Sequence, residues 1–346
     1  MSGDAVVRTV LGDIPHDELG IVYAHEHLII QGGLGVMKNS DLRLNSVEKA
    51  VEEINDCKKY SAKTFVDFMP LDSGRNPSAL VEIAKRTETH IIATTGFHKP
   101  MYYDDLHWIY SYSLDQIVDL LIQECEVGMD KHSYNGPLVE RLSAKAGVLK
   151  GASDYNVIKS VSKKLFEAVA MAHLETGVPI ATHTEHGTCG LEQIELLAKF
   201  GVKPENVIIC HMDRNPDIYV HKELGGTGCF IEYDNATRVK YHPDSESVSL
   251  IVRMIEAGFQ DKILLGTDFA LRSYWKAYGG GPGMAYLLET FIPRLKKQGI
   301  PAETVNRFIT QNPQNAYSLK KIQSKLVAGG VKDDNEKQGS LSYRGN

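Results

Sequence analysis

Short apolar runs alternate with segments of helical spacing along most of the chain. Runs of four to eight apolar or β-branched residues are typical of strands, whereas apolar residues three and four positions apart are typical of helices. Eight runs have the strand pattern: 20–27, 63–68, 90–95, 146–150, 179–183, 207–211, 229–233 and 263–268. Helical spacing covers segments 46–60, 154–176, 191–200, 286–297 and 302–311. Asn45 with Glu48 resembles a capping box before the first of these helices.

Eight strands that alternate with helices fit two architectures, a closed (β/α)₈ barrel and a doubly wound open sheet. An open sheet that binds a dinucleotide should carry the G-x-G-x-x-G pattern between its first strand and the next helix. The first strand is followed instead by Gly32, Gly33 and Gly35, which lack a helix-opening context and are interpreted as a flexible loop. We therefore predict an α/β fold of the TIM-barrel type.

The two ends of the chain differ from the repeating part. The first 19 residues have the pattern of a short β-hairpin or lid before the barrel, and the last 20 or so are polar. We expect one barrel domain over residues 1–325 and a flexible tail over residues 326–346.

Composition excludes several classes of protein. The 346 residues are 42% hydrophobic and 24% charged, as in an ordinary globular chain, and the net charge of −6 with no basic stripe argues against nucleic-acid binding. No apolar run approaches the 18 residues that span a membrane, and the N-terminus lacks a signal-peptide pattern. Five scattered cysteines form no disulfide framework. A cytoplasmic protein without membrane or nucleic-acid partners is expected.

The first predicted strand ends in His25-Glu26-His27. Because side chains alternate along a strand, the two histidines emerge on one face, roughly 7 Å apart along the chain. Two neighbouring imidazoles can chelate one cation, and zinc is a metal that they favour. The pair is a weak signal by itself, so metal binding depends on whether other strands supply further ligands.

Four later strands supply them. Lys150, His183, His211 and Asp268 each end a predicted strand. The carboxyl ends of parallel barrel strands meet at one face, where the active sites of such barrels lie. Lys150 alone is more simply interpreted as a lysine that extends to solvent, because an ammonium has no lone pair for a metal. A lysine of lowered pKa can instead react with CO₂, and the resulting carbamate can bridge two ions.

These residues lie in stretches that resemble the phosphotriesterase family of the amidohydrolase superfamily, over nearly all of residues 5–320. The stretches that carry the resemblance are 9–14, 24–28, 96–100, 145–150, 182–183, 210–213, 266–268 and 311–316. The resemblance implies a binuclear metal centre, usually of zinc. It implies that His25, His27 and Asp268 hold the more buried ion, that His183 and His211 hold the outer ion, and that carboxylated Lys150 bridges them with a hydroxide. Lys145 is the competing lysine, but it begins its strand and faces the other end of the barrel.

Two cations lower the pKa of a shared water and polarise the group under attack. Asp268, at the metal and on the substrate side, is the expected catalytic residue, which takes a proton from the hydroxide and donates it to the leaving group.

The loops after the last two strands indicate the substrate. They carry Arg238, Lys240, Arg272, Tyr274 and Tyr278, which we expect to bind an anionic group. The loops after strands 7 and 8 are a recurrent phosphate site in barrels, although a solvated charged loop would fit the residues equally well.

The resemblance favours the branch of the family that hydrolyses phosphorylated sugar lactones. We therefore expect a metal-dependent hydrolase that opens an aldono-1,4-lactone 5-phosphate by attack of the metal-bridging hydroxide. The alternatives are a phosphotriesterase or a lactonase that acts on N-acyl homoserine lactones. A non-catalytic binding protein is the alternative outside enzymes, although none of the family's ligand positions is lost. Family members often form homodimers. The roles of His186 and of the loop 97–103 stay open.

Overall fold

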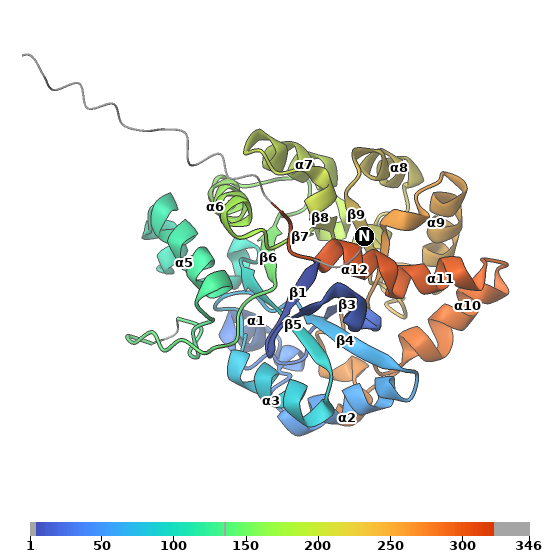
Figure 1. Cartoon of the computed structure of the whole chain (residues 1–346), viewed down its shortest axis with the longest axis horizontal. Coiled ribbons are helices and arrows are strands. Elements are labelled where there is room, and N and C mark those ends of the chain that lie inside the picture. The colour runs from blue at the N-terminus through green and yellow to red at the C-terminus, as the bar shows by residue number, and fades with distance from the viewer. Residues whose placement is uncertain (1–4, 135, 322–346) are drawn as a thin grey trace, which may run out of the picture.

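Eight parallel strands form a nearly closed barrel in the computed structural model, which describes residues 5–134 and 136–321 (Figure 1). Each strand pairs with the next one along the chain. The strands are β3 (Ile21–Glu26), β4 (Ala62–Asp67), β5 (His90–Gly96), β6 (Val148–Ala152), β7 (Ile180–His183), β8 (Val207–Ile209), β9 (Phe230–Tyr233) and β10 (Ile263–Leu265). The predicted (β/α)₈ barrel is confirmed.

The barrel closes between its first strand and the segment that follows its last one. The backbone N–H groups of Thr267 and Asp268 donate to the carbonyl oxygen of His25, at 3.2 and 3.0 Å. The buried carboxylate of Glu26 strengthens this seam, because it accepts from the backbone N–H of Thr267 at 2.9 Å and from its hydroxyl at 2.5 Å. Closure therefore brings two of the predicted ligands, His25 and Asp268, to the same point.

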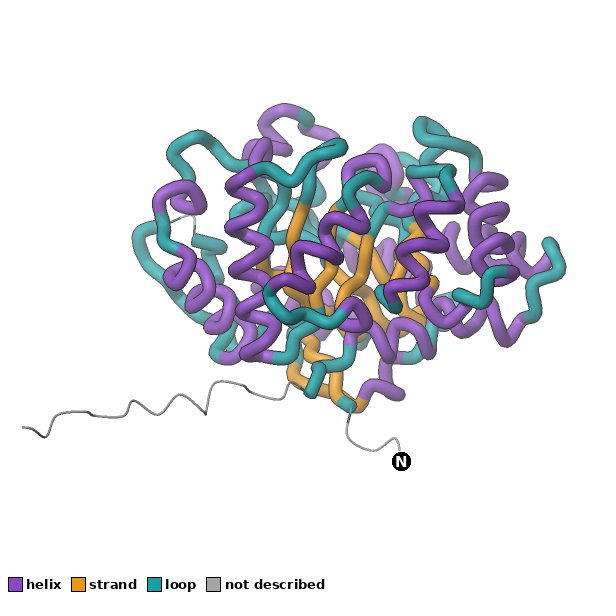
Figure 2. The backbone as a smooth tube through the Cα atoms, turned by 90° about the horizontal axis from the view of Figure 1, so that it is seen from above, coloured by secondary structure: helices purple, strands orange, loops and turns teal. Residues whose placement is uncertain are grey.

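Helices surround the strands (Figure 2). The longer ones are α2 (Val47–Lys58), α3 (Pro77–Thr87), α5 (Leu114–Glu126), α6 (Ser160–Thr176), α7 (Gly190–Lys199), α8 (Ile218–Thr227), α9 (Asp244–Glu256), α11 (Ala302–Ile309) and α12 (Gln311–Tyr317). Shorter ones are α1 (Gly33–Lys38), α4 (Trp108–Ser111) and α10 (Ile292–Lys297), the last directly after a π-helical turn at Leu287–Phe291.

The strands bury alternate residues in two separate apolar clusters. Val148, Ala181 and Phe230 belong to the cluster that includes the interior of the barrel, whereas their neighbours Leu149, Ile180 and Ile231 pack with the helices. Since strand side chains alternate, the residues two positions further along also point inward. Those residues are Lys150, His183 and Glu232. The same alternation that fills the barrel thus delivers polar groups to its carboxyl end.

The N-terminal hairpin consists of β1 (Val6–Thr9) and β2 (Gly12–Pro15), which pair antiparallel. Val7 is buried in the interior cluster, and the backbone of Val10 donates to Ile91 at the start of β5, at 2.9 Å. The hairpin therefore covers the amino end of the barrel, opposite to the carboxyl ends of the strands. It is visible near the N-terminus in Figure 2.

Several local predictions were wrong. Ser46, not Asn45, caps α2, since its hydroxyl accepts from the backbone N–H of Lys49 at 3.3 Å. The expected flexible glycine loop forms the short helix α1. β6 continues to Ala152, so Lys150 lies within the strand rather than at its end.

The helix expected from residue 154 begins only at Ser160. The chain before it turns on a bridge between Asp154 and Val157.

Residues 326–346, predicted as a tail, lie outside the described residues, and the single-domain boundary at 325 stays a prediction. Within residues 5–134 and 136–321, no helix is long and apolar enough to cross a membrane.

A buried ion pair joins the loop after β4 to α5. Both side chains of the Arg75–Glu124 pair are fully buried, and Glu124 also accepts from the backbone N–H of Asp130 at 2.9 Å. Glu124→Ala should therefore lower the free energy of unfolding by about 3–5 kcal/mol, because it leaves a buried guanidinium without its partner. Denaturant unfolding measures this loss.

Glu48→Ala is the matched control, because Glu48 pairs with Arg86 on the surface with 73% of its side chain exposed. This change should cost less than about 1 kcal/mol. Equal losses in the free energy of unfolding for the two variants would show that the buried pair stabilises the fold no more than the surface pair does.

Candidate metal centre and active-site cavity

A cavity of about 260 Å³ lies at the carboxyl ends of the barrel strands. All six residues predicted as metal ligands line it: His25, His27, Lys150, His183, His211 and Asp268. They come from five strands or from the segments directly after them. His211 and Asp268 lie beyond the ends of β8 and β10 and adopt left-handed backbone conformations, with φ of 62° and 48°. Such strained conformations in non-glycine residues are concentrated at functional sites.

His25, His27 and Asp268 lie close enough together to hold a common ion. Oδ1 of Asp268 lies 3.0 Å from Nε2 of His27 and 3.7 Å from Nε2 of His25. The ring of His211 is 4.8 Å from that of His25 and 4.6 Å from that of His183, between centroids. The structure therefore brings together residues that lie up to 243 positions apart in the sequence.

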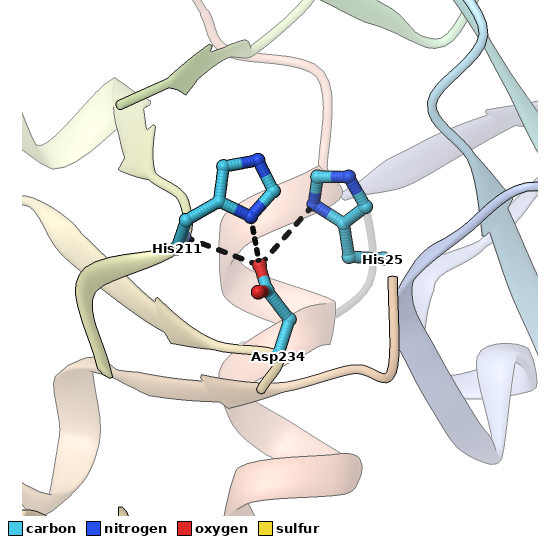
Figure 3. A group of neighbouring side chains, drawn as sticks. All are labelled: His25, His211 and Asp234. Carbon is cyan, nitrogen blue, oxygen red and sulfur yellow. Dashed lines mark hydrogen bonds and ion pairs between the residues drawn. The ribbon is translucent and has the colours of Figure 1, made fainter. Parts of the chain in front are cut away.

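Buried carboxylates contact the Nδ1 atoms of His25 and His211. Figure 3 shows Asp234 between His25 and His211, with its Oδ2 atom 3.7 and 2.7 Å from their Nδ1 atoms. Glu232 lies 2.9 Å from Nδ1 of His25. These three side chains could themselves surround an ion, but carboxylates that engage the rear nitrogen of a histidine more often orient it for a metal on the other nitrogen. Asp234 and Glu232 are therefore interpreted as groups that orient the ligands.

An unpartnered imidazole nitrogen shows whether a cation fits this site. Nε2 of His25 is buried and has no hydrogen-bond partner within the part of the chain that the structure describes. Burial lowers the pKa of His25 and His211 well below the usual value, although Asp268 opposes this shift. The neutral imidazole is the form that binds metals. A divalent cation beside Asp268 would satisfy the unpartnered nitrogen, so the donor set fits a metal.

Lys150 is buried beside this cluster. Its Nζ atom donates to the carbonyl oxygen of Phe68 at 2.9 Å. Burial lowers the pKa of the ammonium, although the nearby acidic groups raise it. The uncharged amine, which is the form that can react with CO₂, is thereby favoured.

Two arginines that the sequence analysis did not combine with the metal site contact Asp268. The guanidinium groups of Arg214 and Arg238 both reach Oδ2 of Asp268. Burial raises the pKa of Asp268, but the charge of Arg238 and the contact with His27 outweigh it and hold the pKa well below the usual value. Arg238 was predicted as a substrate contact, whereas Arg214 was missed. Its position three residues after His211 was the available signal.

The opposite wall of the cavity comes from the loop after β5. His98, Lys99 and Tyr102 line the cavity, and Lys99 forms an ion pair with Glu185. Glu185 also lies 3.1 Å from Nε2 of His183. Burial and Glu185 act in opposite directions on His183, and burial prevails, which lowers its pKa to about 4. The loop therefore contributes to the site through residues that sequence reasoning had left without a role.

The predicted substrate contacts divide into two groups. Arg238 and Lys240 line the cavity, whereas Arg272, Tyr274 and Tyr278 do not. Arg272 donates to Asn45 at 3.0 Å, and the hydroxyl of Tyr278 accepts from the backbone of Ser46 at 3.2 Å.

Tyr274 lies behind Arg238, whose guanidinium is 5.5 Å from the centre of its ring. In this conformation Arg272, Tyr274 and Tyr278 contact residues around the cavity and do not line it.

Histidines, an aspartate and a buried lysine gather at the carboxyl end of this barrel. This combination is typical of metal-dependent hydrolases. The chain matches the phosphotriesterase family model over residues 5–317, and it belongs to that family. The predicted membership of this hydrolase family is confirmed.

Similar proteins agree with this assignment. A phospho-furanose lactonase of Mycoplasmopsis agalactiae is 36% identical, over 94% of this chain and 98% of the relative. The crystal structure of an amidohydrolase from Mycoplasma synoviae superimposes with a TM-score of 0.90 at 34% identity, over 93% of this chain and 94% of that one.

A more distant structure shows a ligand. The phosphotriesterase homology protein of Escherichia coli, complexed with phosphate in its active site, superimposes with a TM-score of 0.80 at 28% identity, over 87% of this chain and 99% of that one.

Removal of an orienting carboxylate should weaken metal binding without removing a ligand. We expect Asp234→Ala to lower the affinity for zinc about 10- to 100-fold, because His25 and His211 lose the group that fixes their orientation. Competition with a chromogenic chelator measures the affinity. Asp261→Ala, which removes a largely exposed carboxylate at the amino end of β10, should leave it unchanged. An unaltered affinity in Asp234→Ala would show that Asp234 does not act through the ligands.

Proposed function

We propose that the protein opens the ring of a phosphorylated sugar lactone, of the aldono-1,4-lactone 5-phosphate type, with two zinc ions. The relatives named phospho-furanose lactonase and the phosphate in the active site of the Escherichia coli protein support this substrate class. The observation that carries the proposal is the charge of the cavity. Apart from Lys150, which the proposal carboxylates, four cationic side chains line it against the carboxylates of Glu185 and Asp268, on a chain of net charge −6.

Several of these cations have donors to spare for an anion. The Nε atoms of Arg214 and Arg238 are buried and have no hydrogen-bond partner in the described part of the chain. The exposed ammonium of Lys240 pairs with no carboxylate among those residues and lies 4.8 Å from the ring centre of Tyr241. Arginine and lysine donors of this kind bind phosphate strongly. Arg238 and Lys240 therefore hold the phosphate in the proposal.

The metal ligands are assigned as the resemblance implied. His25, His27 and Asp268 would hold one ion, His183 and His211 would hold the other, and carboxylated Lys150 would be a ligand of both. The carbamate forms when the neutral Nζ atom attacks CO₂, which creates an N–C bond and releases one proton. When bound, such an ion pair lowers the pKa of a bound water and polarises the lactone carbonyl.

The chain's own residues complete the reaction. Asp268 accepts a proton from the attacking water and returns it to the ring oxygen as the C–O bond breaks. Arg214, which contacts Asp268, is placed to stabilise the new carboxylate of the open-chain product. Arg272, Tyr274 and Tyr278 remain proposed substrate contacts, which would require movement of the loop after β10.

The second candidate is a phosphotriesterase or an N-acyl homoserine lactone lactonase. One part of the cavity wall favours it, because Ile30, Val36 and Leu42 are apolar and suit a neutral substrate. An aryldialkylphosphatase of Saccharolobus solfataricus is 27% identical, over 88% of this chain and 97% of the relative. Purified metal-replete protein that leaves 5-phosphorylated aldonolactones intact but hydrolyses triesters or acyl lactones would establish this candidate instead.

A cytoplasmic location and a homodimer are also retained as proposals. All five cysteines are buried free thiols, which suits a reducing compartment.

Loss of one phosphate contact should affect only phosphorylated substrates. Lys240→Ala should raise KM for a 5-phosphorylated aldonolactone about 10- to 100-fold, since a hydrogen bond to a charged group contributes about 1.5–3 kcal/mol. The same variant should hydrolyse an unphosphorylated γ-lactone as the wild type does. Lys203→Ala, at an exposed lysine in the loop between α7 and β8, is the control. Equal effects on both substrates would contradict a phosphate contact.

The carbamate can be detected directly. Wild-type protein given ¹³C-bicarbonate and zinc should show a carbamate carbon resonance and bind two ions per chain. Lys150→Gln should lack the resonance and bind fewer ions, because it lacks the amine. Lys145→Gln removes the competing lysine and should change neither result. A resonance that persists in Lys150→Gln would place the carbamate elsewhere.

A further inference from the structure

A second hollow lies beside the active-site cavity. This side cleft is lined by Tyr155, His186 and Pro216, among others, and has a volume of about 620 Å³. It shares Glu185 and Arg214 with the active-site cavity. The two spaces are therefore neighbours that have a common wall.

The wall contains two rings in edge contact. His186 belongs to the side cleft and Tyr241 to the cavity, and their ring centroids are 5.5 Å apart at an angle of 77°. The His186 ring also contacts the ring of Tyr155, which lines the side cleft, with 5.8 Å between the centroids and an angle of 87°. The guanidinium of Arg214 lies 4.8 Å from the centre of the Tyr241 ring and continues the wall.

The charged members of the wall are tied to partners in the cavity. Glu185 is paired with Lys99, and Arg214 with Asp268. His186 has much weaker ties. Its side chain is 49% exposed, and its Nε2 atom lies 3.7 Å from Glu185. Loss of the His186 ring would therefore remove part of the wall without breaking the ion pairs of the site.

The backbone holds His186 in an unusual conformation. Its φ and ψ are 54° and 33°, in the left-handed region that is unfavourable for a non-glycine residue. Such strain persists where the surroundings require a particular side-chain direction. Here that direction places the ring in contact with both Tyr155 and Tyr241.

We propose that His186 is a specificity-determining residue, whose ring separates the active-site cavity from the side cleft and restricts the enzyme to small lactones. The cavity of about 260 Å³ is slightly smaller than most small-molecule sites and suits a single substituted ring. A lactone with a longer chain would need the side cleft. This inference rests on the proposed lactonase function of the same site.

Removal of the ring tests the inference. His186→Asn keeps a residue that tolerates the left-handed conformation, and metal-replete full-length protein should then hydrolyse γ-nonalactone with a kcat/KM at least about tenfold higher than the wild type. The value for a 5-phosphorylated pentonolactone should stay within about threefold. His186→Phe retains a flat ring and should keep the selectivity of the wild type. Unchanged selectivity in His186→Asn would overturn the proposal.

A binding measurement separates this inference from the proposed function. The ketone 3-pentylcyclopentanone has the ring and chain of γ-nonalactone but no ester bond, so calorimetry reports its affinity even if no lactone is hydrolysed. His186→Asn should bind it at least about tenfold more tightly than the wild type and His186→Phe. Equal affinities would refute the partition, whereas a wild type that hydrolyses no lactone would refute only the proposed function.

Protein stability provides the last control. Thermal unfolding of each variant shows whether the fold is retained, and His186→Gly, which adopts positive φ without strain, replaces His186→Asn if that variant unfolds.

Discussion

The hydrogen bonds between His25 and the segment after β10 are the contact on which the rest of the structure depends. The carbonyl oxygen of His25 accepts from Thr267 and from Asp268, and these bonds close the barrel. The side chains of His25 and Asp268 extend from the same two backbone segments into the cavity. The contacts that close the barrel therefore also position two of the residues proposed to bind metal, so loss of these contacts would separate them.

Burial of charge is the second constraint. Glu26, Glu232 and Asp234 are fully or almost fully buried at this end of the barrel, and burial raises the pKa of all three. Each has a specific partner, because a buried carboxylate without one would destabilise the fold: Glu26 accepts from Thr267, whereas Glu232 and Asp234 contact imidazoles. The contacts of Glu232 and Asp234 also restrict the orientation of His25 and His211. The interactions that stabilise this region are consequently the ones that arrange its chemistry.

The loops add most of the charged groups around the ends of the strands. Lys99 and Glu185 join two loops across the cavity, whereas Arg214 and Arg238 converge on Asp268 from the segments after β8 and β9. The cavity is thereby lined by cationic side chains from several loops and by apolar side chains such as Ile30, Val36 and Leu42. In this arrangement the strands and the segments directly after them supply the histidines and the aspartate, and the loops supply most of the surrounding charges.

The sequence alone determined the barrel and the six residues gathered at its centre. Periodicity predicted the eight strands and placed these side chains at one face, because a two-residue alternation fixes which side chains point inward and parallel strands present their carboxyl ends together. The resemblance to the phosphotriesterase family, and not periodicity, implied that the six residues form one ligand set. Tertiary structure alone decided which nitrogen of His25 is free and that Asp234 supports two ligands. It also decided that Arg214 reaches Asp268 and that Arg272 turns toward Asn45. These are contacts of long side chains and loops between distant segments, and no local pattern encodes their direction.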